Sequence, residues 1–449
     1  MPYSQNIQDF LKRSQISIGD EVEFTVGHRK FKGFLLPREE TDFGNPDVLL
    51  IKLPNGYNIG FELSKIEGLR RLSGKTEFER FPSLETREQR KDLPPITILS
   101  TGGTISARVD YVTGGVAMLF SPEEILFGVP ELGDIVRIRK AERIFSLASE
   151  DLAPSQWAQV ASKVIASLSE GDAGVIVLHG TDTMHFTSAA LSFMIRGLNA
   201  PVILTGAQRS PDRGSRDADL NLLASAYAAS KLPCSIVAIC FHGSSSDDYA
   251  LVLRGTKVRK MHTSVRNAFR PINDLPVARI FKDGRLEMLQ QAVKPRAQEN
   301  PWLDGSFEEK TAMLYAYPNS NPELLDFLLD KGYRGFIILG SGLGHVPTQT
   351  VDEKASWLKS IERALAEGAF VGMASQCIYG RVDPYVYRNA RIILKLGVVY
   401  LEDMLAETAY VKLGWLLGHN FALEDVRRLM LHNFAGELGG RENAKTFLF

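Results

Sequence analysis

The chain has 449 residues, of which 44% are apolar and 23% are charged, and its formal net charge is −1. This composition provides for a large buried core and excludes an intrinsically disordered chain. The net charge excludes overall attraction to nucleic acid, and no apolar run approaches the ~20 residues that a membrane span needs.

The N-terminal stretch MPYSQNIQDFLKRSQ is polar and has no signal-peptide core. The cysteines Cys234, Cys240 and Cys377 show no metal-ligand spacing. Their small number in a long chain predicts a reducing, cytoplasmic location. We interpret all three as small buried hydrophobic residues.

Residues 1–75 are predicted to form a small SH3-like β-barrel. Within EVEFTV, Val22, Phe24 and Val26 alternate as they do on one face of a strand. Further along, Asn55 and Gly56 separate two alternating apolar runs, which is the strongest short signal for a β-hairpin. The segment has no cluster of catalytic residue types, so we interpret it as a docking or oligomerisation module.

Residues 76–95 are densely charged and end in two prolines, which is typical of an exposed linker. Over residues 96–295, short β-branched runs such as PITILST and AGVIVLHG alternate with helical stretches such as SQWAQVASKVIASLSEG. Strand–helix alternation predicts a large α/β domain with a parallel sheet and helices on both faces.

A second linker is predicted over residues 296–310, and strand–helix alternation resumes over residues 311–449. This C-terminal part ends in helices, including LEDVRRLML. The predicted organisation is therefore a small β domain, a large α/β domain and a smaller α/β domain.

Two loops that follow predicted strands have unusual residues, and such loops bind ligands in open parallel sheets. In ILSTGGTISA, Gly102 and Gly103 allow a backbone shape that other residues resist. In VIVLHGTDTMHFT, Thr181 and Asp182 place a hydroxyl beside a carboxylate. The structural interpretation is a hydroxyl-capped turn for the first loop and a helix N-cap for the second. The functional alternative is that these hydroxyls and the carboxylate form a nucleophile with a proton relay.

The segment LRGTKVRKMHTS contains Lys257 among small and polar residues. A solvated lysine is the ordinary interpretation, whereas a lysine near a hydroxyl and a carboxylate can transfer protons. His179 and His185 lack a third ligand at metal-site spacing, so no metal site is predicted. The glycines of LGSGLGH, residues 339–345, fail the spacing of a dinucleotide loop.

Taken together, these motifs resemble the L-asparaginase/glutaminase family. ILSTGGTIS is similar to the family's TGGTI signature and HGTDTM to its second signature, and the two lie 77 residues apart. SLASEDLAP, LTGAQRSPDRGSRDADLNL and LRGTKV match further family segments in the same order. The resemblance runs from about residue 95 to the C-terminus and implies an asparaginase-like, two-domain α/β core with amidohydrolase activity.

Carried over position by position, the resemblance implies Thr104 as the nucleophile and a proton-relaying set of Thr181, Asp182 and Lys257. The alternative is that Thr181 attacks first. The positions implied for substrate binding are Gly103, Tyr111, Ser149 and Glu150.

Amide hydrolysis suits these residue types, because it needs a hydroxyl, a group that takes its proton, and donors for the developing oxyanion. Backbone N–H groups of the Gly102–Gly103 turn and near Thr181 are the expected donors. Asp182 is expected to pair with the ammonium of an amino-acid substrate. Lys257 would need a desolvated site and a lowered pKa to accept a proton near neutral pH.

The N-terminal extension of about 95 residues resembles the D-subunit family of archaeal glutamyl-tRNA(Gln) amidotransferases. That resemblance implies a cytoplasmic glutaminase subunit that hydrolyses glutamine to glutamate and ammonia without a cofactor of its own. A partner E subunit would bind the mischarged Glu-tRNA(Gln), activate its glutamate with ATP and Mg, and accept the ammonia. Two D and two E subunits are implied, with tRNA held mainly by E.

Two alternatives stand against this hypothesis. The first is a free-standing cytosolic L-asparaginase with an extra N-terminal domain, which strong asparagine hydrolysis without a partner would favour. The second is a scaffold protein that keeps the fold without the chemistry. The joint presence of Thr104, Thr181, Asp182 and Lys257 argues against the second.

Overall fold

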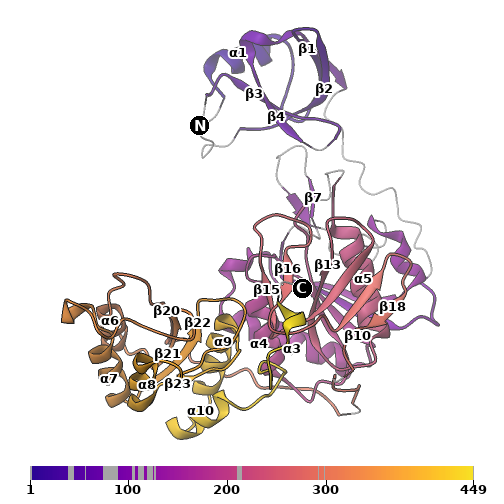
Figure 1. The fold of residues 1–449 in the computed structure, drawn as a ribbon. Helices are drawn as coiled ribbons and strands as arrows, with labels where there is room; N and C mark the ends of the chain where they lie inside the picture. Colours follow the sequence, from indigo (N-terminus) through magenta and orange to yellow (C-terminus); the bar gives the residue numbers. More distant parts are fainter. Residues whose placement is uncertain are drawn as a thin grey trace.

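The structure is a computed structural model, and Figure 1 shows an N-terminal domain, a large α/β domain and a smaller C-terminal α/β domain. Among the described residues, no helix is both long and apolar enough to cross a bilayer. The described residues are 3–38, 45–55, 57–73, 89–103, 107–109, 116–118, 125, 128–209, 215–291, 293–297 and 299–447.

The N-terminal domain is a five-stranded antiparallel sheet in the order β4-β3-β2-β1-β5, as expected for a small β domain. β3 and β4 form the predicted hairpin, with Lys52 paired to Asn58, while Gly56 lies outside the described residues. The strands are β1 (Glu21–Val26), β2 (Arg29–Leu35), β3 (Val48–Lys52), β4 (Asn58–Glu62) and β5 (Glu67–Ser73).

Helix α1 (Gln5–Arg13) precedes this sheet and was missed by the sequence reasoning. Its N-cap is Ser4, whose hydroxyl accepts a hydrogen bond from the backbone N–H of Ile7. Ile7 and Leu11, one helical turn apart, are buried against Val22 and Phe24 of β1. The Ser cap and the four-residue apolar spacing were the available signals for this helix.

The large domain has an eight-stranded sheet in the order β18-β17-β14-β13-β12-β10-β6-β9. The five strands from β13 to β9 run parallel, which confirms the predicted parallel core. The three remaining strands run antiparallel and form an edge that the sequence pattern did not indicate. The strands are β6 (Pro95–Ser100), β9 (Arg137–Arg143), β10 (Gly174–Leu178), β12 (Val202–Thr205), β13 (Val237–His242), β14 (Tyr249–Arg254), β17 (Ala278–Phe281) and β18 (Leu286–Met288).

Helices cover both faces of this sheet, because alternate strand residues point to opposite sides. Val175 and Val177 of β10 pack with α3 (Pro154–Ser169) and α4 (Met184–Met194), whereas Ile176 and Leu178 pack with α5 (Ala218–Lys231) on the other face. Two cysteines, Cys234 and Cys240, are buried as expected, but Cys377 is exposed, which corrects that expectation. Cys377 lies in the loop after a strand, where its side chain faces solvent.

The C-terminal domain is a four-stranded parallel sheet in the order β20-β21-β22-β23. Its strands are β20 (Thr311–Tyr315), β21 (Gly335–Gly340), β22 (Phe370–Ser375) and β23 (Val399–Tyr400). Its helices are α6 (Glu323–Asp330), α7 (Leu358–Ala366), α8 (Arg388–Leu396), α9 (Ala406–Leu417) and α10 (Leu423–Met430). α9 packs against α4 of the large domain, so both domains share one apolar core.

The segment between the two α/β domains is tied to the large domain. Within it, β19 (Trp302–Leu303) pairs antiparallel with β11 (Ile195–Arg196) at the end of α4. The Trp415 indole N–H of α9 donates to the carbonyl of Asp304 at 3.1 Å. This linker therefore helps to fix the C-terminal domain in place.

Candidate active site

The first two candidate loops leave the sheet side by side. β6 and β10 are neighbouring parallel strands, with Ser100 paired to Leu178. The N–H of Thr101 donates to the Leu178 carbonyl at 3.0 Å, and its hydroxyl donates to the same oxygen at 3.3 Å. Thr101 is therefore the residue that closes strand β6, and the loop chemistry lies beyond it.

The glycines after Thr101 pack directly against neighbouring backbone. Gly102 and Gly103 have φ of +128° and +88°, in the region that side-chain-bearing residues rarely adopt. A Cβ on Gly102 would lie 2.2 Å from the carbonyl oxygen of Leu147, and one on Gly103 would lie 2.7 Å from the nitrogen of Gly180. Glycine is required at both positions, so that Gly103 can touch the loop that carries Thr181. The predicted nucleophile Thr104 and the predicted binding residue Tyr111 lie outside the described residues.

Thr181 and Asp182 share one lysine, and that lysine is Lys260. Its Nζ donates to Thr181 Oγ1 at 2.9 Å and to Asp182 Oδ1 at 2.5 Å. Lys260 is the last residue of β15 (Val258–Lys260), which forms a hairpin with β16 (Phe269–Pro271). Its side chain is 9% exposed, whereas that of Asp182 is 64% exposed. A hydroxyl, a carboxylate and an amine thus meet at one point.

Lys257, the lysine expected in this set, lies elsewhere. Its Nζ is 2.6 Å from Asp403 Oδ2 and 3.1 Å from the Asp403 carbonyl, in a buried position. Lys257 lies just before β15 and points toward the C-terminal domain, whereas Lys260 at the end of β15 points toward Thr181. Burial lowers the pKa of Lys257, and Asp403 opposes that shift. The desolvated lysine anticipated from the sequence exists, but outside the site.

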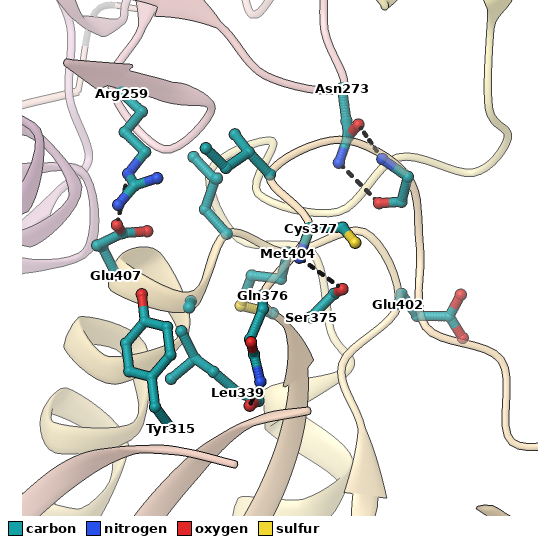
Figure 2. A pocket seen from close by; sticks show the side chains of 14 residues that line it. Arg259, Asn273, Tyr315, Leu339, Ser375, Gln376, Cys377, Glu402, Met404 and Glu407 are labelled. Atoms are coloured by element: carbon teal, nitrogen blue, oxygen red, sulfur yellow. Dashed lines mark hydrogen bonds and ion pairs between the residues drawn. The ribbon is translucent and has the colours of Figure 1, made fainter. Parts of the chain in front are cut away.

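Arg259 points to the same side as Lys257 and also meets the C-terminal domain. Its Nε lies 2.7 Å from Oε1 of Glu407 on α9, as Figure 2 shows. Asn273, just after β16, exchanges two hydrogen bonds of 2.9 Å with the backbone of Gly380. The hairpin is therefore fastened to the C-terminal domain on one side while Lys260 faces Thr181 on the other.

Ser149 and Glu150 reach the site from the loop after β9. The hydroxyl of Thr183 donates to the Ser149 carbonyl at 2.6 Å, and the N–H of Thr183 donates to Ser149 Oγ at 3.4 Å. Ser149 Oγ in turn donates to Glu150 Oε2 at 3.2 Å. Ser149 is buried and Glu150 is exposed. The structure thus brings Ser149 against the Thr181 loop, with Glu150 at the rim.

The loop after β12 also borders the candidate site. The sequence analysis did not predict this role. A Cβ on Gly206 would lie 2.6 Å from the His179 carbonyl and 3.0 Å from Thr181 Cγ2. The buried carboxylate of Asp217 accepts hydrogen bonds from the N–H groups of Gln208 and Arg209 at 2.9 to 3.1 Å. Gly206 and Asp217 both lie in LTGAQRSPDRGSRDADLNL, a segment that resembles the family. These two residues were the available signal that this loop packs against the loop of Thr181.

The two histidines near the site are buried and neutral. Burial lowers the pKa of His179 to about 4 and that of His185 to about 3. His179 Nδ1 donates to the Gly180 carbonyl at 2.6 Å, and its Nε2 accepts from the Thr187 hydroxyl at 2.8 Å. Within the described ranges, no three His, Cys, Asp or Glu side chains gather as a metal ion requires.

Three protein-family models match the N-terminal β domain, the large α/β domain and the C-terminal α/β domain in that order. Residues 16–69 match the GatD N-terminal domain, residues 95–294 the N-terminal asparaginase domain, and residues 310–430 the glutaminase/asparaginase C-terminal domain. Along its length the chain is 45% identical to the glutamyl-tRNA(Gln) amidotransferase D subunit of Pyrococcus furiosus, covering 98% of this chain and 99% of that one. The D subunit of Methanopyrus kandleri is 42% identical, covering 98% and 95%.

The chain belongs to the D-subunit family of glutamyl-tRNA(Gln) amidotransferases.

Solved asparaginases share the core of this D-subunit family member. The L-asparaginase of Thermococcus kodakarensis is 29% identical with a TM-score of 0.68, and L-asparaginase I of Vibrio cholerae is 27% identical with a TM-score of 0.66. Each covers 77% of this chain, and this chain covers 100% and 99% of them. The D-subunit relatives, by contrast, extend over nearly the whole chain, including the N-terminal β domain. The asparaginase-like fold with an N-terminal β domain is thereby confirmed.

Proposed function

We propose that this chain hydrolyses glutamine and supplies the ammonia with which a glutamyl-tRNA(Gln) amidotransferase converts Glu-tRNA(Gln) to Gln-tRNA(Gln). The observation that carries the proposal is the contact of Lys260 with both Thr181 and Asp182, beside the Gly102–Gly103 turn. This arrangement supplies a hydroxyl, an amine and a carboxylate at the carboxyl ends of parallel strands.

In the proposed reaction, a threonine hydroxyl attacks the carboxamide carbon of glutamine. The C–O bond forms as the hydroxyl proton passes to a basic group, and the amide oxygen becomes an oxyanion that backbone N–H groups stabilise. The C–N bond then breaks and the nitrogen leaves as ammonia after taking up a proton. Water cleaves the resulting ester, which releases glutamate and restores the hydroxyl.

Thr104 is the proposed nucleophile, and Thr181, Asp182 and Lys260 form the proposed proton-relaying set. Lys260 is proposed to exchange a proton with the Thr181 hydroxyl across the 2.9 Å contact. Asp182 holds the lysine through Oδ1. Its exposed Oδ2 is left to accept from the α-ammonium of glutamine.

The proposed partners follow from the family. An E subunit would bind the mischarged tRNA, use ATP and Mg, and receive the ammonia, while this chain needs no cofactor for its own step. We further propose that two copies of this chain pair through the C-terminal domain. Tyr315, Tyr317, Leu324 and Phe327 lie close in sequence and are each more than half exposed, which is typical of an interaction surface.

Transfer of labelled amide nitrogen tests the proposed function. The full chain is mixed with its E subunit, Glu-tRNA(Gln), ATP, Mg²⁺ and glutamine labelled with ¹⁵N at the amide, and the label in Gln-tRNA is measured by mass spectrometry. We expect label in the tRNA-bound glutamine with the native chain and none with Thr104→Val. Strong asparagine hydrolysis by the chain alone, with no label transfer, would contradict the proposal and favour a free-standing asparaginase.

Sedimentation tests the proposed pairing of two copies. Phe327→Asp is expected to shift the chain toward the monomer, because a charge on the paired surface loses its hydration. Val351→Asp, at a fully exposed apolar position outside this surface, serves as the control and is expected to leave the mass unchanged. Equal behaviour of the two variants would place the pairing surface elsewhere.

A further inference from the structure

A cavity of about 370 Å³ lies at the end of the large sheet away from the candidate active site. It is bounded by Arg196 of β11, by Val237 at the start of β13 and by Arg254 at the end of the antiparallel β14. The C-terminal loop 433–436 closes another side. Thr181, by contrast, follows the carboxyl end of a parallel strand, so the two sites sit at opposite ends of the sheet.

The residues that line this cavity carry three cations and no carboxylate. They include Arg196, Arg254 and Lys294. Arg254 is neutralised by Asp274 at 2.9 Å. Neither Arg196 nor Lys294 makes an ion pair with any residue in the described part of the chain. The charges of Arg196 and Lys294 are therefore left without a counter-charge from the described residues.

Arg196 is held in place by aromatic rings instead of by an acid. Its guanidinium lies 5.7 Å from the ring centre of Trp415 and 5.4 Å from that of Phe434. Such stacking orients a guanidinium while its N–H groups remain available at the edges. Phe434 itself lines the cavity, so the held guanidinium borders the space.

Ser235 adds a buried donor without a partner. The residue is 6% exposed and lines the cavity, and its hydroxyl makes no hydrogen bond within the described structure. Its own N–H already donates to the Lys294 carbonyl at 3.0 Å, which brings these two residues together. A buried hydroxyl without a partner is costly, and rotation of the side chain toward the cavity would let a ligand oxygen satisfy it.

We propose that this cavity binds a phosphate group. A guanidinium, an ammonium and a hydroxyl from three separate segments offer donors to a tetrahedral oxyanion with several acceptor oxygens. The two oxygens of a carboxylate lie in one plane, whereas the oxygens of a phosphate point in four directions and suit donors from separate segments. The cavity volume is in the range of small-ligand sites, so a phosphate monoester of a small molecule would fit. The phosphate is supplied by a free small molecule or by the backbone of an RNA.

Equilibrium dialysis of the full chain against radiolabelled inorganic phosphate tests this proposal. We expect saturable binding that Lys294→Gln and Ser235→Ala each weaken about tenfold or more, as loss of a charge-assisted or buried hydrogen bond implies. Lys294 is exposed, so its variant is not expected to disturb folding. Lys359→Gln, which removes the same charge at an exposed site on α7, is expected to bind like the native chain.

Unlabelled competitors added to the same dialysis identify the source of the phosphate. Displacement by a small phosphate monoester but not by tRNA indicates a metabolite, and displacement by tRNA that depends on Lys294 indicates an RNA backbone. Equal binding by the native chain, Lys294→Gln and Ser235→Ala would overturn the proposal, as would acetate that competes as well as phosphate. Displacement by glutamine would also overturn it, because the phosphate would then occupy the candidate active site.

Discussion

The ammonium of Lys260 lies 2.9 Å from the hydroxyl oxygen of Thr181, although the two residues are 79 positions apart in the chain. The contact depends on the strand geometry of β15, which turns Lys260 toward the loop after β10. On the opposite side of the same extended segment, Lys257 and Arg259 pair with Asp403 and Glu407. The C-terminal domain therefore holds the strand that carries the site's amine.

Asp182→Asn is expected to reduce glutamine hydrolysis about 10²-fold or more with little effect on stability. The carboxylate positions Lys260, and a misplaced proton-transfer group costs rate. Asp182 is 64% exposed, so its ion pair contributes at most about 1 kcal/mol to folding. Steady-state kinetics and urea unfolding measure the two effects. Glu353→Gln, which breaks an exposed ion pair with Lys359, is the control and should leave both quantities unchanged.

Gly103→Ala is expected to separate the loop after β6 from the loop after β10, which carries Thr181. An added Cβ would stand 2.7 Å from the nitrogen of Gly180, so one loop must move, and a displacement of this size costs about 10²-fold in rate. Gly171→Ala is a matched control, because Gly171 has a similar φ of +92° and nothing within 4 Å of the added atom. Both variants incur similar backbone strain of about 1–2 kcal/mol. Equal activity of the two would show that the contact with Gly180 is unimportant.

Lys257→Met is expected to destabilise the core by about 3–5 kcal/mol, because it leaves the buried carboxylate of Asp403 without its cation. Lys257→Met combined with Asp403→Asn removes both charges, and the Asn side-chain oxygen can still accept the Gly439 N–H that Asp403 Oδ1 accepts at 2.8 Å. The double variant is therefore expected to recover most of the loss in urea unfolding. A double variant as unstable as Lys257→Met alone would contradict the assigned pairing.

Acid is expected to destabilise the chain through its buried histidines. Burial lowers the pKa of His179 to about 4 from an ordinary 6.5, so the unfolded state binds more protons between these values. Stability is then complete above pH 6.5 and falls as the pH decreases toward 4. At pH 5 this histidine should account for a loss of about 2 kcal/mol relative to pH 7.5.

Urea unfolding at pH 7.5 and pH 5.0 measures this loss. His179→Gln lacks the titrating ring, so its stability should decrease by about 2 kcal/mol less than that of the native chain between the two pH values. An identical decrease in both proteins would show that His179 does not carry the acid sensitivity.

Much of the site was predictable because its parts follow strands. The runs before Thr101 and His179 read as buried strands, and parallel neighbours bring their loops to one edge of the sheet. The glycine turn and the Thr181–Asp182 pair were found for that reason. Helix α1 and the antiparallel direction of β14 were not predicted, because strand alternation and parallel crossovers indicate neither.

The structure places Lys260, and not the expected Lys257, beside Thr181 and Asp182, because residue types alone do not specify the direction of a side chain. Lys257 and Lys260 stand in the same short segment, and the partner that removes Lys257 from the site, Asp403, lies 146 residues away. The alternation of side chains along a strand was the available signal. It places Lys257 and Arg259 on one side of the segment and Lys260 on the other. The supporting role of Asp217 was equally hidden, because its partners are backbone N–H groups.

The most direct test compares glutamine hydrolysis by two variants in the presence of the E subunit and Glu-tRNA(Gln). Lys260→Met is expected to lose about 10²- to 10⁴-fold in kcat/KM, the range of general acid–base catalysis. Lys257→Met combined with Asp403→Asn is expected to stay within a few-fold of the native chain, because neither residue contacts Thr181 or Asp182. Activity retained by Lys260→Met and lost by the double variant would contradict the assignment of Lys260 to the site.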